Sequence, residues 1–447
     1  MTCAKYRSVA LATVALIGLP ALAQETQEQS PPDPQTAALL ERIEQLEAEL
    51  ADLRGVVLQS TETASKAEAA AQDAVDRIAE VQDQASPAPS YAVSPGMPDT
   101  KWHLAGYADV GFVGGDTPGP DSFVSGKFNP ALHFQYKDFL LFEGEFEYAT
   151  TGDGKTESEL EYSQIDLVLN DHAVLVVGKY LSPIGQFQER LHPSWINKVQ
   201  GAPAGFGHDG VQPTSDTGVQ LRGSIPAGST RLTYALAVGN GPRTTSEGGV
   251  ELMGMGSDDN SNKSVGGRVG FFPMPALEVG GSYLTARVDG IMNPDMPVPS
   301  GSGLPLDARF QLWGVDAAYT KGPLAARFEY LKSERGKLFT VTDEEPDGVL
   351  LPDLEMEAWY GQLSYRLSGF SDSEIIHRLE PVVRYGEFSI SGHPELEEEN
   401  AQNRLNAGLN YWLAPTIVAK AGLEWRDYTV PGVPDETLIQ FQLGYGF

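Results

Sequence analysis

Residues 438–447 read Leu-Ile-Gln-Phe-Gln-Leu-Gly-Tyr-Gly-Phe, and apolar and polar residues alternate along them. Phe441, Leu443, Tyr445 and Phe447 fall on one face of an extended chain, and Gln440, Gln442, Gly444 and Gly446 fall on the other. Successive side chains of a β-strand point to opposite faces, so this stretch predicts a strand with one apolar and one hydrated side. A soluble sheet can end in the same way. The number of times that the pattern recurs therefore decides the fold class.

The same alternation recurs through most of the chain after residue 100. Sixteen segments are predicted as strands: 101–112, 125–137, 140–150, 158–170, 173–180, 217–226, 229–240, 263–272, 276–288, 306–320, 324–336, 355–368, 375–390, 402–413, 416–428 and 436–447. Connections after even-numbered segments are short turns, and those after most odd-numbered segments are long. This asymmetry is typical of bacterial outer-membrane barrels. We therefore predict an all-β transmembrane barrel of 16 antiparallel strands over residues 101–447, with fourteen and eighteen strands as alternatives.

The faces of these segments support a membrane barrel. The apolar faces of five predicted strands carry no charge, for example Leu232, Tyr234, Leu236 and Val238, whereas Arg327 and Glu329 lie on the opposite face of their segment. An Arg or Lys that faces lipid at the bilayer midplane costs about 2–4 kcal/mol. The apolar face must therefore point outward. A soluble β-sandwich also alternates, but it does not explain why the long loops lie on one side only.

The first 100 residues divide into three segments with different patterns. Lys5, Arg7, an apolar core and an Ala21-Leu22-Ala23 cleavage site predict a secretory signal peptide over residues 1–23. A membrane anchor is the alternative, but the apolar core is short for a bilayer span. Apolar residues at steps of four and three predict an N-terminal α-helical coiled coil over 35–84, either dimeric or trimeric, with a single amphipathic helix as the alternative. Prolines mark a linker over 85–100.

Composition excludes several classes of function. The chain has 447 residues, a net charge of -30 and one cysteine, Cys3, which lies in the predicted signal peptide. The mature protein is therefore expected to lack disulfides and thiolate metal sites. Strong acidity argues against a nucleic-acid partner. Neither a hydrolase motif, nor a nucleotide-binding loop, nor a paired histidine spacing is present in the sequence, so we expect no enzyme, no cofactor and no metal.

Two short motifs resemble a known family. The run Gly-Lys-Tyr-Leu-Ser-Pro-Ile-Gly-Gln-Phe at 178–187, with the signal peptide, the coiled coil and the barrel, resembles the phosphate-selective porin O and P family and its coiled-coil-bearing dicarboxylate relatives. The resemblance implies a homotrimer in the Gram-negative cell outer membrane, with lipid around the barrel and the coiled coil in the periplasm. The terminal residues Tyr445 and Phe447 are similar to the signal that the barrel assembly machinery recognises.

Charged residues on the inward faces supply the candidate site. The predicted pore-lining bases are Arg222, Arg231, Arg268, Arg327, Arg366, Arg384, Arg404 and Lys420, and the predicted pore-lining acids are Glu143, Glu145 and Glu147. The longest connection, about 181–216, is predicted to be the third external loop and to narrow the pore through Glu189, Arg190, His192 and Lys198. A loop packed outside the barrel or into a neighbouring subunit is the alternative.

These features predict a passive porin with a water-filled channel for small hydrophilic solutes. The inward cations favour anions such as phosphate or dicarboxylates. Acidic loops, for example at 343–347 and 395–399, would repel anions at low salt. A cation-preferring general porin is therefore one alternative. The other is an envelope-tethering structural protein whose coiled coil contacts peptidoglycan.

Overall fold

The computed structural model describes residues 92–94 and 97–447, apart from 118, 125, 208–209, 229, 254–257, 293–302, 342–346 and 371–372. The chain divides into two units, residues 1–88 and 89–447. The predicted signal peptide and coiled coil lie outside the described residues, as does most of the predicted linker. The second unit is a β-barrel, and it begins with the strands β1 (Ala92–Ser94) and β2 (Met97–Asp116), slightly before the predicted boundary at residue 101.

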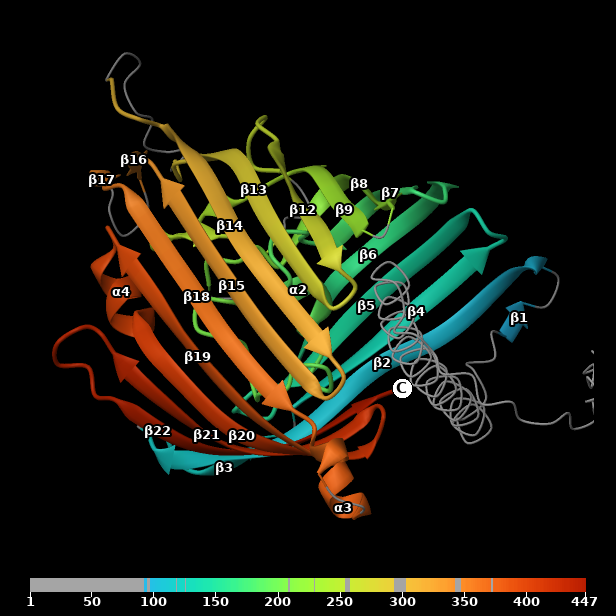
Figure 1. Ribbon diagram of the computed structural model, residues 1–447. Coiled ribbons are helices and arrows are strands. Elements are labelled where there is room, and N and C mark those ends of the chain that lie inside the picture. The colour runs from blue at the N-terminus through green and yellow to red at the C-terminus, as the bar shows by residue number, and fades with distance from the viewer. Residues whose placement is uncertain are drawn as a thin grey trace, which may run out of the picture. The chain divides into compact units, whose positions relative to one another are not determined.

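Sixteen long strands, counted within the described residues, form the wall of the barrel (Figure 1). After β2 these are β4 (Lys127–Tyr136), β5 (Leu140–Thr150), β6 (Thr156–Asn170), β7 (Ala173–Leu181), β8 (Ser215–Ala227), β9 (Thr230–Gly239), β12 (Ser264–Met274), β13 (Leu277–Asp289), β14 (Asp307–Lys321), β15 (Leu324–Arg335), β18 (Leu354–Tyr365), β19 (Leu379–Ser391), β20 (Gln402–Ala414), β21 (Ile417–Tyr428) and β22 (Glu436–Gly446). Each pairs antiparallel with its neighbours, and β22 pairs with β2 to close the ring. The predicted sixteen-stranded antiparallel barrel is confirmed.

The strand β2 closes the barrel because it pairs with the last strand along one edge and with the next strand along the other. Its second half, Tyr107 to Asp116, pairs with β22, while residues Thr100 to Ala108 pair with β4 on the other edge. The short strand β3 (Ser122–Val124) continues the second edge. The backbone N–H of Gly106 donates to the carbonyl of Phe447 at 3.0 Å, and the N–H of Phe447 donates back at 2.9 Å. The last residue of the chain is therefore hydrogen-bonded to the first long strand.

The outer face of the barrel is apolar, as the alternation predicts. Of the terminal residues, Phe441 is 51% exposed and Leu443 43%, and Leu236 on β9 is 53% exposed. Charged and amide side chains instead lie buried on the inner face, among them Glu145, Asp166 and Arg268. This arrangement is the reverse of that in a soluble domain, and it suits a wall that lies between lipid and water. No helix in the described part of the chain is long and apolar enough to cross a membrane.

The two ends of the barrel differ in their connections. Long loops at one end carry the hairpins β10–β11 (Arg243–Thr244, Val250–Glu251) and β16–β17 (Leu338–Thr340, Val349–Leu351) and the helix α4 (Pro394–Asn400). The other end has tight turns, except where η1 (Leu367–Gly369) and α3 (Glu374–His377) join β18 to β19 (Figure 1). The strand predicted over 375–390 therefore begins only at Leu379. The adjacent Ile375 and Ile376 break the alternation, and the N–H of His377 donates to the carbonyl of Ser373 in a helical turn.

The apolar core lies inside the barrel, between one wall and the connection from β7 to β8. Buried loop residues Ile184, Phe187 and Phe206 pack against inward side chains such as Leu312 on β14 and Tyr360 on β18. The Phe206 and Tyr360 rings meet edge to face, with their centroids 5.0 Å apart. Because this core belongs to β13–β19, the loop is held against that wall. The opposite wall, β4–β8, keeps its polar inner face.

Candidate functional site

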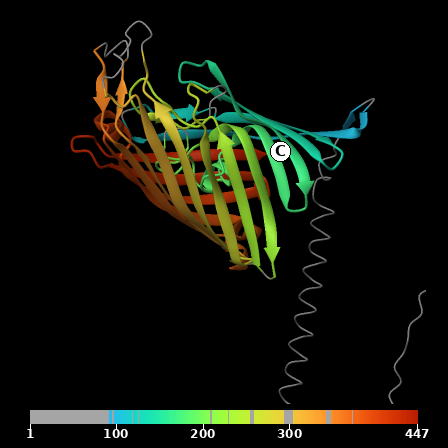
Figure 2. The ribbon, with the colours of Figure 1, turned by 90° about the horizontal axis from the view of Figure 1, so that it is seen from above.

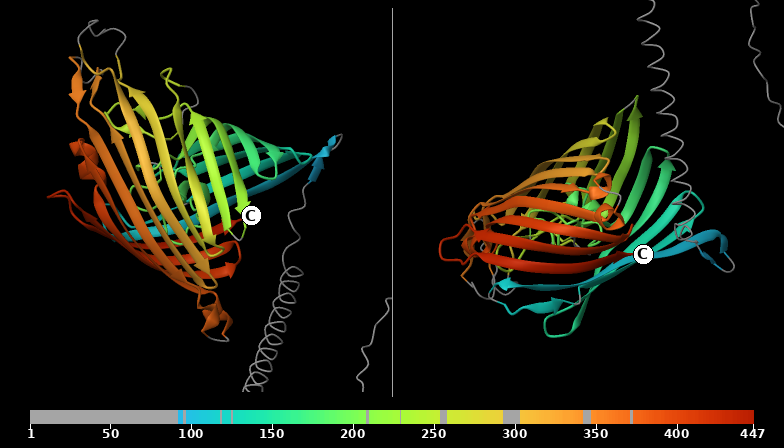
Figure 3. Two further views of the ribbon diagram at one scale, coloured as in Figure 1. Left: turned by 45° about the horizontal axis from the view of Figure 1, so that its top comes forward. Right: turned by 60° about the horizontal axis from the view of Figure 1, so that its bottom comes forward.

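The connection from β7 to β8, residues 182–214, lies within the ring of strands (Figures 2 and 3). Its described residues contain one short helix, α2 (Phe187–Arg190). Its contacts reach inward side chains far along the chain: the N–H of Gly185 donates to Ser282 at 3.0 Å, and the side chain of Asn410 donates to the carbonyl of Lys198 at 2.9 Å. Because the loop starts at β7, ends at β8 and contacts β13 and β20, it crosses the interior of the barrel and narrows it.

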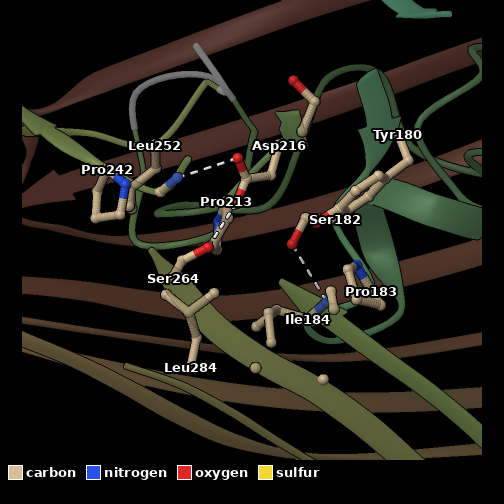
Figure 4. A pocket seen from close by; sticks show the side chains of 15 residues that line it. Tyr180, Ser182, Pro183, Ile184, Pro213, Asp216, Pro242, Leu252, Ser264 and Leu284 are labelled. Atoms are coloured by element: carbon tan, nitrogen blue, oxygen red, sulfur yellow. Dashed lines mark hydrogen bonds between the residues drawn. The ribbon is translucent and has the colours of Figure 1, made fainter. Parts of the chain in front are cut away.

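The two ends of this loop are fixed around a small pocket (Figure 4). The carboxylate of Asp216 accepts hydrogen bonds from the hydroxyl of Ser264 at 2.7 Å and from the backbone N–H of Gly241 at 3.1 Å. The N–H of Ser182 donates to the carbonyl of Thr214 at 3.0 Å, which joins the start of the loop to its end. The pocket encloses about 20 Å³, enough for one water molecule. The hydrogen bonds around the pocket therefore hold the ends of the loop in place. The pocket itself is too small to pass solutes.

Carboxylates of β13–β15 hold the first part of the loop. Glu329 is buried and accepts from the backbone N–H of Gln186 at 2.8 Å. Arg190 on α2 pairs with Glu278 at 2.7 Å. Arg268 joins this network through Glu278 at 3.0 Å and through both oxygens of Asp316. These ion pairs fix α2 at a defined distance from the wall.

Cations of β19–β21 hold the second part of the loop. Arg384 donates to the carbonyls of Gly201 at 3.1 Å and Ala202 at 3.2 Å, and Lys420 donates to the carbonyl of Ser194. Arg384 is 2% exposed, Lys420 3% and Arg268 5%. The sequence predicts that Arg384 and Lys420 line the pore, and both point inward, but carbonyl groups of the loop cover them. Arg268 is buried by its ion pairs with Glu278 and Asp316, and it still borders a cavity beside α2.

The other predicted bases do not form one array. Arg327 donates to the side chain of Gln186 at 3.2 Å, and Arg404 donates to the carbonyl of Ala202, also at 3.2 Å. Near the short turns, Arg231 stacks over the ring of Phe272 and Arg366 over the ring of Trp412. Arg222, on β8, is 33% exposed and pairs with Asp166 at 2.5 Å. Arg222 also faces α2, with its Nη1 atom 4.0 Å from Glu189.

The predicted acids lie on the open wall, β4–β8. Glu143, Glu145 and Glu147 share the inner face of β5, whereas Phe146 and Tyr148 are exposed on its outer face. Glu147 pairs with Lys127 at 2.8 Å. Glu145 lies 3.7 Å from His192 of the loop. The acidic face of β5 and the loop are thus in contact. Lys198, predicted for the same constriction, instead reaches Glu380 and Ser364 on the far wall.

A β-bulge adds an acid that sequence reasoning missed. Glu145 pairs with Tyr162 of β6 and Phe146 pairs with Leu160, so Glu161 is the extra residue of the bulge and is buried on the inner side. The sequence carries the signal, because the outward apolar positions change from even numbers at Leu160 to odd numbers at Ile165. A change of parity within one strand predicts a bulge.

Two cavities lie on either side of α2. The first holds about 260 Å³, and its charged lining includes Asp109, Lys127, Glu147 and Glu161. The second holds about 400 Å³ and is lined by Glu189, Arg190, Arg222 and Arg268, with Thr233 and Tyr234. Phe187 and Gln188 face the first cavity, while Glu189 and Arg190 face the second. The four residues of α2 therefore separate two charged cavities, each large enough to hold several water molecules or a small solute.

A closed sixteen-stranded barrel with an apolar outer face, a charged interior and a loop inside it defines the class of porin-type barrels. Residues 298–429 match the family model of the phosphate-selective porin O and P. The resemblance to this family that the sequence motifs indicate is confirmed over that segment. None of the curated protein sequences matched the chain.

Several solved structures are similar in fold. The anion-selective porin from Comamonas acidovorans has 12% identity and a TM-score of 0.49 over 78% of this chain and 100% of its own. The outer membrane channel DcaP of Acinetobacter baumannii has 12% identity and a TM-score of 0.48 over 78% and 97%. The trimer form of OmpT of Vibrio cholerae has 13% identity and a TM-score of 0.47 over 78% and 99%. At these identities the similarity concerns the course of the strands alone.

Proposed function

We propose that the chain forms a passive channel for small hydrophilic solutes in the Gram-negative outer membrane. One observation carries the proposal: α2 lies inside a closed barrel with a charged cavity on either side of it. Hydrated solutes diffuse through such a polar interior, and the loop sets the width of the passage. We further propose a homotrimer with its coiled coil in the periplasm, assembled by the barrel assembly machinery, with peptidoglycan as a candidate contact.

The charges of the open wall favour small cations. Within the described strands β4–β8, inward carboxylates outnumber the inward cations Lys127 and Arg222; these carboxylates include Glu143, Glu145, Glu147, Glu159, Glu161 and Asp166. Rings of Asp and Glu select cations in channels. The anion preference expected from the sequence, for phosphate or dicarboxylates, depends on a set of bases that includes Arg384 and Lys420, which the loop covers.

Single-channel recording in a planar bilayer under a potassium chloride gradient tests both the proposed channel and its proposed preference for cations. We expect current, with a reversal potential of the sign that indicates potassium preference. Neutralising two acids together, Glu143→Gln with Glu147→Gln, should shift the reversal potential toward chloride, because both face the open wall. Glu398→Gln with Glu399→Gln, an equal loss of two charges at exposed positions of helix α4, is the matched control.

Chloride preference of the unchanged protein would restore the anion-selective interpretation. A folded protein without any conductance would overturn the channel itself and favour the envelope tether.

A further inference from the structure

The cavity of about 400 Å³ beside α2 has an unusual order of charges. Glu189 of α2 lies between two guanidinium groups, with 3.8 Å to Nε of Arg190 and 4.0 Å to Nη1 of Arg222. Neither separation is a direct hydrogen bond. The three side chains are between 28% and 37% exposed, so each can reach a solute in the cavity. The described residues therefore present cation, anion and cation in one row.

The guanidinium groups are already neutralised on the sides that face away from Glu189. Arg222 pairs with Asp166 at 2.5 Å and lies 3.9 Å from Glu143. Arg190 pairs with Glu278 at 2.7 Å, and Arg268 shares that carboxylate. Carboxylates thus outnumber guanidinium groups around the cavity. A solute that carries net negative charge meets an unfavourable field here, even though the nearest donors are cationic.

Several groups around the cavity can still form hydrogen bonds with a ligand inside it. Arg190 and Arg222 each use one terminal nitrogen for their close ion pairs, and a guanidinium group has five N–H donors. The hydroxyl of Thr233, which also lines the cavity, is buried and has no hydrogen-bond partner. Val174 and Ala235 supply an apolar wall. Such a lining suits a small organic solute with a carboxylate at one end.

From this charge order we infer that the cavity beside α2 is a binding subsite for small zwitterions of the amino-acid type. The carboxylate of the solute accepts from N–H groups of Arg190 and Arg222 that face the cavity, and its ammonium group lies on Glu189. A zwitterion pairs with both the guanidinium groups and the carboxylate of Glu189 and adds no net charge. A simple anion pairs only with the guanidinium groups, and a simple cation only with the carboxylate. The inference rests on the proposed channel function and names its solute class.

Block of the ionic current by three matched solutes tests the subsite. The probes are L-serine, N-acetyl-L-serine, which lacks the ammonium group, and L-serine amide, which lacks the carboxylate. We expect the apparent dissociation constant of L-serine to be about tenfold lower than that of either analogue, as expected for one charge-assisted contact. Glu189→Gln should remove most of that advantage by raising the constant for L-serine, while Glu398→Gln should leave it unchanged.

Each of the other outcomes overturns the inference. N-acetyl-L-serine that binds as tightly as L-serine would define an anion site, and an equally tight amide would define a cation site. Current that none of the three solutes blocks would leave the channel without this subsite. Absence of current would instead overturn the proposed channel function, so the two failures are distinguishable.

Discussion

At the scale of single residues, the position of the internal loop depends on a glycine. Gly185 has a φ of +71°, and a Cβ atom there would lie 1.8 Å from Oε1 of Glu329. That carboxylate oxygen also accepts the N–H of Gln186. Only a residue without a side chain allows the loop to approach Glu329 so closely in this left-handed conformation.

Replacing Gly185 should therefore destabilise the loop and widen the passage. Gly185→Ala adds about 1–2 kcal/mol of backbone strain and also displaces the buried carboxylate. Gly201→Ala is the control, because Gly201 has a similar φ of +74° and nothing within 4 Å of the added atom. We expect Gly185→Ala to lower the thermal midpoint more than the control does, and to raise single-channel conductance. Equal effects of the two variants would show that Glu329 does not position the loop.

The direction in which a side chain points could be predicted from the sequence, but what covers it could not. Arg384 and Lys420 face inward, as alternation requires, yet carbonyl groups of the loop enclose them. Such contacts join residues that are distant in the chain, and a strand pattern carries no information about them. Arg222 differs from Arg384 because it stays 33% exposed, although Glu189 of the loop lies 4.0 Å away.

At the scale of elements, the strand β22 determines whether the barrel closes. Its ladder with β2 runs from Gly446 to Thr437, and two further backbone hydrogen bonds join Phe447 to Gly106. The ring of Phe447 stacks on the ring of Phe128, with centroids 6.3 Å apart. The final residue thus contributes both to the ladder and to the outer apolar face.

Deleting Phe447 should reduce the folded fraction of the protein. The deletion removes two backbone hydrogen bonds, each worth about 1 kcal/mol net, together with an aromatic contact. Phe447→Tyr keeps the backbone bonds and the ring, so it serves as the control. The folded fraction can be measured by the heat-dependent shift in electrophoretic mobility. A deletion variant that folds as completely as the control would contradict a role for the terminal residue in closure.

Long strands were predictable, whereas short irregular elements were not. A period of two, repeated over ten or more residues, gives nearly the same bounds in sequence and structure, as for 140–150 and β5. Within the loops, β10–β11 and β16–β17 span only two or three residues per strand, too few for a periodic pattern. Their position depends on contacts with the barrel rim, such as the bond from Thr244 to the carbonyl of Asp289.

At the scale of the whole molecule, the barrel is complete without the first 88 residues. Residues 89–447 form one compact unit, and every strand of its wall begins at or after Met97. Closure therefore uses none of the predicted coiled coil. Trimerisation is a separate proposal, in which the coiled coil and the barrel each contribute.

Deleting residues 35–84 should leave the conductance of one channel unchanged, because the passage is built from β2 to β22 and the internal loop. The measurement is single-channel current, together with the molar mass of the detergent complex by light scattering. The full-length protein, expected to contain three copies, is the reference. Loss of conductance in a deletion variant whose barrel folds would contradict the independence of the two units.

The internal loop also has a mechanical consequence. A thin-walled cylinder deforms most easily by flattening into an ellipse. Here the hydrogen bonds of Arg384, Lys420 and Asn410 tie one wall to a segment that both begins and ends on the other wall, at β7 and β8. The loop therefore connects opposite walls of the barrel through its interior and resists flattening. Changes in lateral pressure of the surrounding bilayer should therefore leave the cross-section of the passage nearly constant.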